Sequence, residues 1–540
     1  MKSCVDFFNR NYRVFLALAI IAAMVHAFHL KQFLVDDAFI SFRYAKNLAD
    51  GHGLVWNIGE RVEGYSNFLW MLLFALGFKL GLKPEMITLI LAIPLHLICL
   101  IFVHSIALKI FKNQSLALIA LLLVGFNHSI SGFASSGLET PLFLCEHLLV
   151  IYLFCVCLEK GWTVSLLLLL SILLNLTLLT RPDGAILIAL TTTAWFLTHR
   201  NKRFTDYAVF IVPFLVIVLP WLIWKQTYYG SIFPNTFNAK VQGLSGIGFG
   251  VFYMYLFVLY YTLAPFLLIL IFKAQPLLRG KPILIFLGIL SLVWIVYTVY
   301  VGGDFMEFRF LAPVIPAIII LILAALLEFT LDKRVFAALV IALCLGTFNN
   351  FSFMTMRFYS YRVERVESLR SHLYAAPENW FAIGHRFKEL FGGTDVKLGI
   401  GAAGAIPFYS ELPAIDFMGL TDKTIPKIAE PFSSMAGHRL IAPLEYLVNN
   451  DVNLIIQPIQ LMFPEPSFHR FQRLATWQDI YRFFMDVDNP VNGKYVDEVQ
   501  LIGIPIEHGF YLVVWYLNRH DAIERAIADH GLKRIFIRRS

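Results

Sequence analysis

Charged residues are scarce in this chain. Asp, Glu, Lys and Arg make up 15% of its 540 residues and hydrophobic residues 58%, whereas soluble globular domains carry about 25% charged residues. A composition this apolar is typical of a polytopic membrane protein. The basic excess of +7 is scattered, with no Lys/Arg run among aromatic residues, so nucleic acid is not an expected partner.

Cysteine is rare as well. The six cysteines lie in or beside hydrophobic segments without a CxxC pair, so they suggest neither a disulfide framework nor a cysteine-based zinc framework. No HExxH, GxSxG or Walker sequence occurs, and this disfavours a metalloprotease, a serine hydrolase or an ATP-driven pump.

Three glycines, Gly399, Gly401 and Gly404, match the dinucleotide fingerprint GxGxxG. The acidic residue expected about 20 positions further on is not clearly placed. The topology that the basic residues predict also places this region on the outer side of the membrane, and no ready NAD pool exists there. We interpret the glycines as a tight turn between a strand and a helix.

Long hydrophobic runs dominate the first two thirds of the chain. We count eleven candidate spans, at residues 14–34, 86–108, 115–131, 141–158, 163–180, 184–198, 207–224, 249–272, 282–301, 308–328 and 335–350. A further run at 68–82 is shorter than the roughly 20 residues that a span needs. We therefore predict an α-helical membrane domain over residues 1–351, with juxtamembrane helices on the outer face over about 36–82.

The basic residues predict the orientation. They gather in alternate gaps between the runs, at 2–13, 109–112, 160, 199–203, 273–281 and 332–334, while the remaining gaps hold the conspicuous motifs. The positive-inside rule places the basic gaps and the N-terminus in the cytoplasm. The motifs then share the outer face, and an odd number of spans places the C-terminus outside.

From about residue 352 the chain changes character, because charges become frequent and apolar runs shorten to strand length. Strand-like segments at 396–400, 453–457 and 510–517 alternate with helix-like stretches at 378–390 and 437–449. This pattern predicts a soluble α/β domain over residues 352–540.

An acidic pair, Asp36 and Asp37, directly follows the first run. Carboxylates are costly in hydrocarbon, so the pair is expected at the water interface, where it meets lipid head groups and water-borne substrates. Residues 38–50 have the spacing of an amphipathic helix lying on the membrane. Either Asp is also a candidate helix cap. One acid suffices for a cap, which leaves the other to face a cavity.

The other candidate ligands lie on the same predicted face. Arg181, in the segment RPDG, is either a phosphate clamp or an interfacial arginine paired with Asp183. Glu63 either contacts a ligand or pairs with Arg61, and Glu139 is either a pocket acid or a cap. The candidates for substrate binding are Arg181, Arg309, Lys240, Arg43, Asp304 and Glu63.

Five segments together resemble a known family: DDAFISFRYAKNLADGHGLVWNIGERVEGYSNFLW (36–70), RPDG (181–184), YYGSIFPNTFNAK (228–240), GGDFMEFRFLAP (302–313) and IGAAGAIPFYSELPAIDFMGLTD (400–422). They are similar to bacterial GT-C glycosyltransferases of the terminal β-(1→2)-arabinofuranosyltransferase type, a group that includes Legionella LphB-like membrane proteins. The resemblance implies a bacterial inner-membrane enzyme with a periplasmic C-terminal domain and a polyprenyl-phosphate sugar donor. It also implies that Asp36 or Asp37 is the catalytic base.

The chemistry implied by this resemblance is inverting transfer of a sugar, with arabinofuranose one option, to an envelope glycan or lipid acceptor. A carboxylate takes the proton of the attacking hydroxyl. Arg181, Arg309 and Lys240, with Arg43 in addition, are expected to face the departing phosphate. A divalent cation held by the acidic pair is an alternative source of positive charge. The rival function is a transporter or flippase of a lipid-linked sugar, which places acids at mid-span instead of at span ends.

Overall fold

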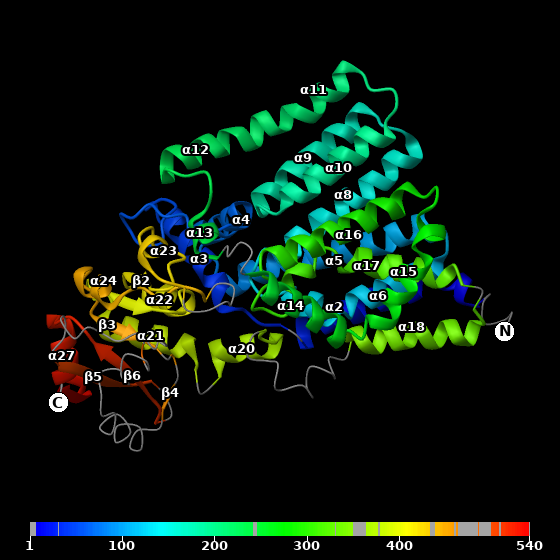
Figure 1. The fold of residues 1–540 in the computed structure, drawn as a ribbon. Helices are drawn as coiled ribbons and strands as arrows, with labels where there is room; N and C mark the ends of the chain where they lie inside the picture. Colours follow the sequence, from blue (N-terminus) through cyan, green and yellow to red (C-terminus); the bar gives the residue numbers. More distant parts are fainter. Residues whose placement is uncertain are drawn as a thin grey trace.

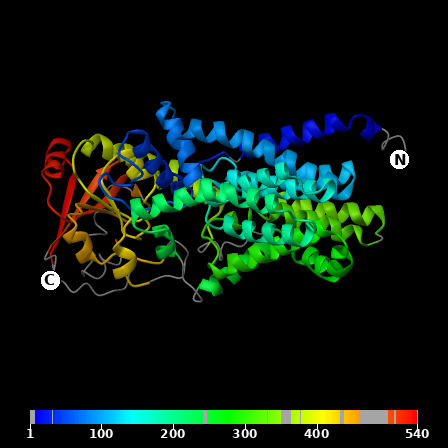
Figure 2. The ribbon, with the colours of Figure 1, turned by 90° about the horizontal axis from the view of Figure 1, so that it is seen from above.

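The computed structural model describes residues 7–30, 32–240, 246–329, 331–348, 363–375, 378–431, 438–457, 459, 461–462, 484, 498–506 and 509–538. Within these residues the chain is mostly helical, with one small sheet near its C-terminus. Figure 1 shows the helix bundle on the right and the sheet on the left. Figure 2 shows that the two parts occupy opposite ends of an elongated molecule.

The bundle contains helices of very different length. In chain order they are α2 (Tyr12–Val25), η1 (His26–Leu30), α5 (Pro84–Phe111), α6 (Gln114–Gly125), α7 (His128–Phe133), α8 (Thr140–Lys160), α9 (Val164–Thr180), α10 (Gly184–Thr198), α11 (Phe204–Pro213), η2 (Phe214–Val218), α12 (Leu219–Tyr229), α13 (Asn235–Lys240), α14 (Ile247–Tyr260), α15 (Ala264–Leu278), α16 (Pro282–Tyr300), η4 (Arg309–Leu311), α17 (Ile315–Leu327) and α18 (Lys333–Phe348).

Five helical segments are long and apolar enough to cross a membrane: Tyr12–His29, Pro84–Phe111, Thr140–Lys160, Phe204–Tyr229 and Pro282–Tyr300. The pair α14 and α15, bent by 101°, makes a sixth if it is one broken span. Other apolar helices, such as α4 (Phe68–Lys79) and α9, have 12 to 17 residues. That is about 18 to 26 Å at 1.5 Å per residue, short of a bilayer core of about 30 Å. The count of eleven spans therefore stays a prediction.

Local sequence explains where several helices begin. A proline lies in the first turn of α5, α8, α16 and α17. Proline lacks a backbone N–H, and in the first turn this costs no hydrogen bond because the N–H groups there have no partner within the helix. Asn113 and Thr163 cap α6 and α9 by accepting a backbone N–H. Residues 315–326 of α17 are all buried, so α17 forms the centre of the bundle. The five cysteines that the structure describes are free thiols, as expected.

The two helices that follow the first run pack on each other, and α4 also contacts α5 and α9 of the bundle. In α3 (Asp36–Ala49), residues 38–45 are all buried. Phe42 stacks on Phe74 of α4 at 4.3 Å, and Phe39 meets Phe408 of α22 (Ala405–Ser410) at 5.3 Å between ring centroids. The expectation of an amphipathic helix lying on the membrane does not fit these contacts, because α4 covers one side of α3 and α22 covers another (Figure 1).

The C-terminal sheet comprises β1 (Leu398–Ile400), β2 (Ala414–Asp416), β3 (Leu454–Ile456), β4 (Leu461–Met462), β5 (Glu498–Pro505), β6 (Tyr511–Tyr516) and β7 (Lys533–Arg538). Its order is β2-β1-β3-β6-β5-β7, with β4 also paired to β6. The pairs β2-β1 and β1-β3 are parallel, and those involving β5, β6 and β7 are antiparallel. The three expected strands are confirmed as β1, β3 and β6.

Helices cover both faces of this sheet. Side chains of α20 (Val366–Tyr374), α21 (Trp380–Phe391), α22 and α27 (Asp521–His530) share a hydrophobic cluster with one face, and the same cluster includes α3 and α4. The other face packs on α23 (Ile425–Ile428) and α24 (Leu444–Asn449). The first loop and the C-terminal sheet therefore share one core, although more than 300 residues separate them in the sequence.

Candidate active site

The glycine motif forms the turn between β1 and α22, as its spacing predicted. The backbone N–H groups of Gly404 and Ala405 donate to the carboxylate of Asp36, at 3.2 and 2.7 Å. Free N–H groups at the start of a helix attract an anion, and here the anion is a side chain of the chain itself. A Cβ on Gly404 would lie 2.0 Å from the backbone oxygen of Asp36, so only glycine permits this approach.

Asp37 is in a different situation. Its side chain makes no hydrogen bond or ion pair with any residue that the structure describes, and it lines a cavity of about 200 Å³ between α3, α20 and the C-terminal region. Burial raises the pKa of Asp36 to about 7, the turn N–H groups lower it, and the Asp37 charge raises it. One acid of the pair thus holds a turn, while the other faces a cavity.

A histidine that sequence reasoning missed lies on the wall of the same cavity. His372 binds Glu364 through Nε2 at 2.9 Å and Glu378 through Nδ1, and its ring stacks on Trp380 at 5.0 Å. Burial lowers the pKa of His372, but the two carboxylates outweigh it and raise the value to about 10. The cavity therefore holds an imidazolium cation beside the acids. No motif marked these residues, and their only signal is a polar stretch after the last run.

Arg181 is enclosed by acids. Its Nε and Nη2 donate to Asp183 at 3.0 Å, and its Nη1 donates to Glu139 at 2.5 Å. Asn67, at the start of α4, donates to the other oxygen of Glu139 at 2.9 Å. The pairing with Asp183, one of the two expected roles, is present, and it leaves Arg181 with two carboxylate partners inside the protein.

Arg309 keeps part of its hydrogen-bonding capacity. Its Nε donates to Asp304 at 2.8 Å, and its side chain is 8% exposed. Its two terminal nitrogens have no hydrogen bond to the described residues, and the charges of Asp304, Glu139 and Asp37 act on it. A buried guanidinium with open donors near a carboxylate-lined cavity suits a phosphate oxygen.

Arg43 binds backbone carbonyl groups instead of acids. It donates to the carbonyl oxygens of Trp56, Pro407 and Leu412 at 2.7, 2.6 and 2.8 Å. Its donors therefore join α3 to the end of α22, and Arg43 is absent from the lining of the Asp37 cavity. The expectation that it contacts the donor does not fit these contacts.

Glu63 forms an ion pair with Lys225 of α12, at 3.0 Å, and both side chains are buried. Burial raises the pKa of Glu63 to about 7, although Lys225 lowers it. Arg61 lies instead over the ring of Tyr228 at 4.6 Å, so the pair expected between Arg61 and Glu63 is not formed. The side chain of Lys240, at the end of α13, lies outside the described residues.

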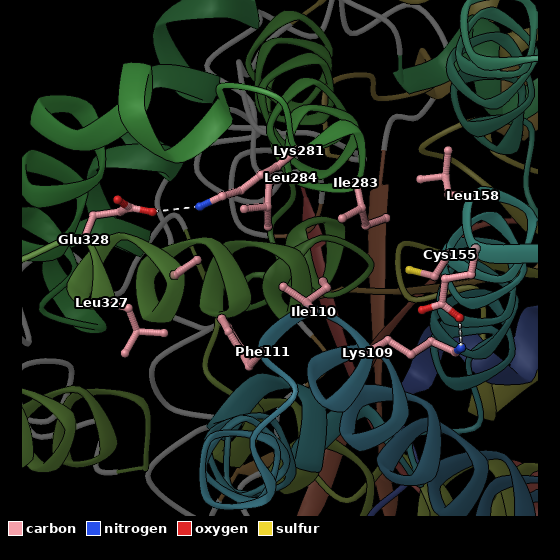
Figure 3. Close-up of a pocket in the computed structure, with 12 residues that line it drawn as sticks. Lys109, Ile110, Phe111, Cys155, Leu158, Lys281, Ile283, Leu284, Leu327 and Glu328 are labelled. Carbon is pink, nitrogen blue, oxygen red and sulfur yellow. Dashed lines mark hydrogen bonds and ion pairs between the residues drawn. The ribbon is translucent and has the colours of Figure 1, made fainter.

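A larger cavity, of about 390 Å³, lies at the other end of the bundle. The ion pairs Lys109–Glu159 and Lys281–Glu328 flank its apolar walls (Figure 3). It opens beside Phe111 at the end of α5, whereas Glu85 at the start of α5 accepts a hydrogen bond from Tyr409 of α22. The 28 residues of α5 extend about 42 Å, so this cavity is remote from Asp37.

Sequence comparison finds similarity to a glycosyltransferase. The terminal β-(1→2)-arabinofuranosyltransferase of Mycobacterium tuberculosis (strain ATCC 25618 / H37Rv) is 27% identical over 228 residues, which is 39% of this chain and 35% of that protein. The match thus spans about a third of the relative. A family model described as a domain of unknown function, DUF8728, matches residues 373–500.

Structural comparison identifies solved proteins with a similar fold. ArnT from Cupriavidus metallidurans, solved bound to undecaprenyl phosphate, has a TM-score of 0.55 and 14% identity, with 95% of this chain and 98% of ArnT covered. The Archaeoglobus fulgidus oligosaccharyltransferase, tethered with an acceptor peptide, has a TM-score of 0.51 and 11% identity, with 95% and 75% covered.

The fold is thus that of GT-C glycosyltransferases, with several apolar helices and a small C-terminal sheet. The five helical segments that are long and apolar enough to cross a membrane fit a membrane protein of that fold. Its resemblance to the arabinofuranosyltransferase type is confirmed by the mycobacterial relative.

Proposed function

We propose that the protein transfers a sugar from a polyprenyl-phosphate donor to an acceptor hydroxyl of a cell-envelope glycan or lipid, on the periplasmic face of a bacterial inner membrane. The observation that carries the proposal is the side chain of Asp37, which lines a cavity without a hydrogen bond to the described residues. The donor class is supported by the undecaprenyl phosphate bound to ArnT.

Asp37 acts as the general base in this proposal. An acceptor hydroxyl in the cavity loses its proton to the Asp37 carboxylate as its oxygen attacks the anomeric carbon, and the polyprenyl phosphate leaves from the opposite side. One displacement inverts the configuration of that carbon. Asp36 does not share this role, because both of its oxygens accept backbone N–H groups.

The leaving phosphate gathers negative charge, and we assign its neutralisation to Arg309, which does not line the Asp37 cavity but is near enough for the charge of Asp37 to act on it. Asp304 binds the Nε of Arg309, and the two terminal nitrogens, which make no hydrogen bond to the described residues, are the donors that this proposal assigns to phosphate oxygens. Arg181 has an indirect role in this proposal. It binds Glu139, and the charge of Glu139 acts on Arg309.

A divalent ion held by the acidic pair fits the structure poorly. The carboxylate of Asp36 already accepts two N–H groups, so the pair presents only Asp37 as a ligand. We therefore assign the neutralisation of the phosphate to arginine.

The experiment is an assay of purified protein in nanodiscs with a panel of labelled polyprenyl-phosphate sugars. Polyprenyl-phosphate arabinofuranose comes first because the relative is an arabinofuranosyltransferase. Transfer of one sugar by the wild type, and its loss in Asp37→Asn, is the expected result. Absence of transfer from every polyprenyl-phosphate donor, with a full set of envelope acceptors, would contradict the proposal.

A further inference from the structure

Three side chains with metal-ligand chemistry meet outside the Asp37 cavity. His128 begins α7, Glu307 lies just before η4, and Glu367 lies in the first turn of α20. The Nε2 of His128 is 3.6 Å from Oε2 of Glu307 and 3.3 Å from Oε1 of Glu367. The three ligand atoms all lie within 4.8 Å of one another.

Two of the three separations are close to those of ligands around an ion, 3.3 and 3.6 Å from His128 to its two carboxylates, and the third is at most 4.8 Å. Zn²⁺ bound tetrahedrally at about 2.0–2.1 Å separates its ligand atoms by about 3.3–3.4 Å. The other described histidines that face carboxylates sit closer: His372 to Glu364 at 2.9 Å, His199 to Asp206 at 3.0 Å and His520 to Asp395 at 2.9 Å. These are hydrogen-bond distances. His128 stands further from both of its carboxylates than any of these.

The surroundings orient the carboxylate of Glu307. Ser129 donates to its Oε1 and the backbone N–H of Val366 donates to its Oε2, both at 3.1 Å. Such supporting hydrogen bonds are usual behind metal-binding carboxylates. The side chains of His128 and Glu307 are 5% and 0% exposed, and that of Glu367 is 47% exposed. The cluster is therefore buried at His128 and Glu307 and open to solvent at Glu367.

We propose that His128, Glu307 and Glu367 bind a divalent transition-metal ion of the Zn²⁺ class. Imidazole combined with carboxylates suits zinc and its neighbours, whereas Ca²⁺ and Mg²⁺ favour ligand sets made of oxygen. The ion joins α7, the loop before η4 and α20.

This metal site has a structural role. None of its three residues lines the Asp37 cavity, but Met306, next to Glu307, and Leu369, two residues after Glu367, both do. The ion holds these two parts of the cavity wall together. The inference stands without the glycosyltransferase proposal, because it concerns only these three ligands.

The test measures metal in the full-length protein, purified in detergent, supplied with equimolar Zn²⁺ and desalted. We expect about one zinc per chain, and at least tenfold less in His128→Gln and in Glu367→Gln. Co²⁺ in place of zinc should give the visible absorption of a tetrahedral site. The matched control is Asp395→Asn, which removes an exposed carboxylate from beside His520 and should leave the zinc content unchanged.

Two outcomes overturn the proposal: zinc below about a tenth of an ion per chain in the wild type, or equal zinc in the wild type and Glu367→Gln. Glu367 is half exposed at the surface of α20, so Glu367→Gln is expected to fold. Its zinc content therefore tests the proposal even where His128→Gln does not fold. Zinc that binds equally to all variants is adventitious.

Discussion

The carboxylate of Asp36 accepts a hydrogen bond from the backbone N–H of Gly404 at 3.2 Å, across 368 residues of sequence. This contact ties the start of α3 to the turn after β1. Because Asp37 is the next residue, the same contact positions the proposed base at the cavity. A side chain in the first loop is thus held in place by the C-terminal region.

Gly404→Ala should disrupt this contact. The new Cβ would lie 2.0 Å from the backbone oxygen of Asp36, and a backbone atom has no flexible end to move aside. We expect transfer to fall at least tenfold, together with a lower midpoint of thermal unfolding. The control is Gly248→Ala, where nothing lies within 4 Å of the added carbon. Equal activity and stability in both variants would show that the turn tolerates a side chain.

The two acids should respond differently to amide substitution. Asp37→Asn removes the proposed base from a side chain without described hydrogen bonds, so transfer should fall roughly 10²-fold or more while stability stays near normal. Asp36→Asn places an amide NH₂ against a backbone N–H, so it should lower the free energy of unfolding by about 1–3 kcal/mol. Initial rates and thermal unfolding in detergent measure the two effects. Parental transfer rates in both variants would remove the acids from catalysis.

Arg309 and Arg181 should also respond differently when each is replaced by lysine. Arg309→Lys has no Nε to hold Asp304 while it offers two further donors, so the apparent affinity for the polyprenyl-phosphate donor should fall at least tenfold. Arg181→Lys loses the fork that binds Asp183 and Glu139, so it should lower stability as well as donor affinity. Donor titrations of transfer, with the exposed Arg519→Lys as control, measure this. Unchanged donor affinity in Arg309→Lys would exclude Arg309 as the phosphate ligand.

His372 should make the protein less stable in alkali. Its folded pKa, about 10, lies above the ordinary value of 6.5 because Glu364 and Glu378 outweigh the effect of burial. A raised pKa means that the stabilisation is fully present below pH 6.5 and is lost as the pH rises to about 10. The charge of His372 in turn lowers the pKa of Asp36, which lines the same cavity.

His372→Asn removes the titrating ring. Its midpoint of thermal unfolding should fall less between about pH 7 and pH 10 than that of the wild type, since the imidazolium contribution is absent at every pH. The difference between the two proteins is the measured quantity, because other groups titrate in both. Parallel pH curves would show that His372 is not an ion-paired cation.

The local pattern of the sequence predicted several elements correctly. Hydrophobic runs became helices, the segments at 396–400, 453–457 and 510–517 became strands, and the glycine motif became a turn. These features depend on periodicity and backbone preference within about ten residues. The same pattern was wrong for α3, whose polar Ser41 and Arg43 are buried, because the helices that cover them are distant in the sequence.

The sequence by itself indicated the class of this protein, since its composition is typical of a membrane protein and its motifs carry the glycosyltransferase resemblance. It also limited the candidate base to two adjacent acids. Only the tertiary structure decided which acid is held and which faces the cavity, which arginine keeps open donors, and which histidines meet carboxylates. Each of these depends on side chains that folding brings together from remote segments. Residues that are far apart in the sequence make such contacts without any local sequence pattern that could predict them.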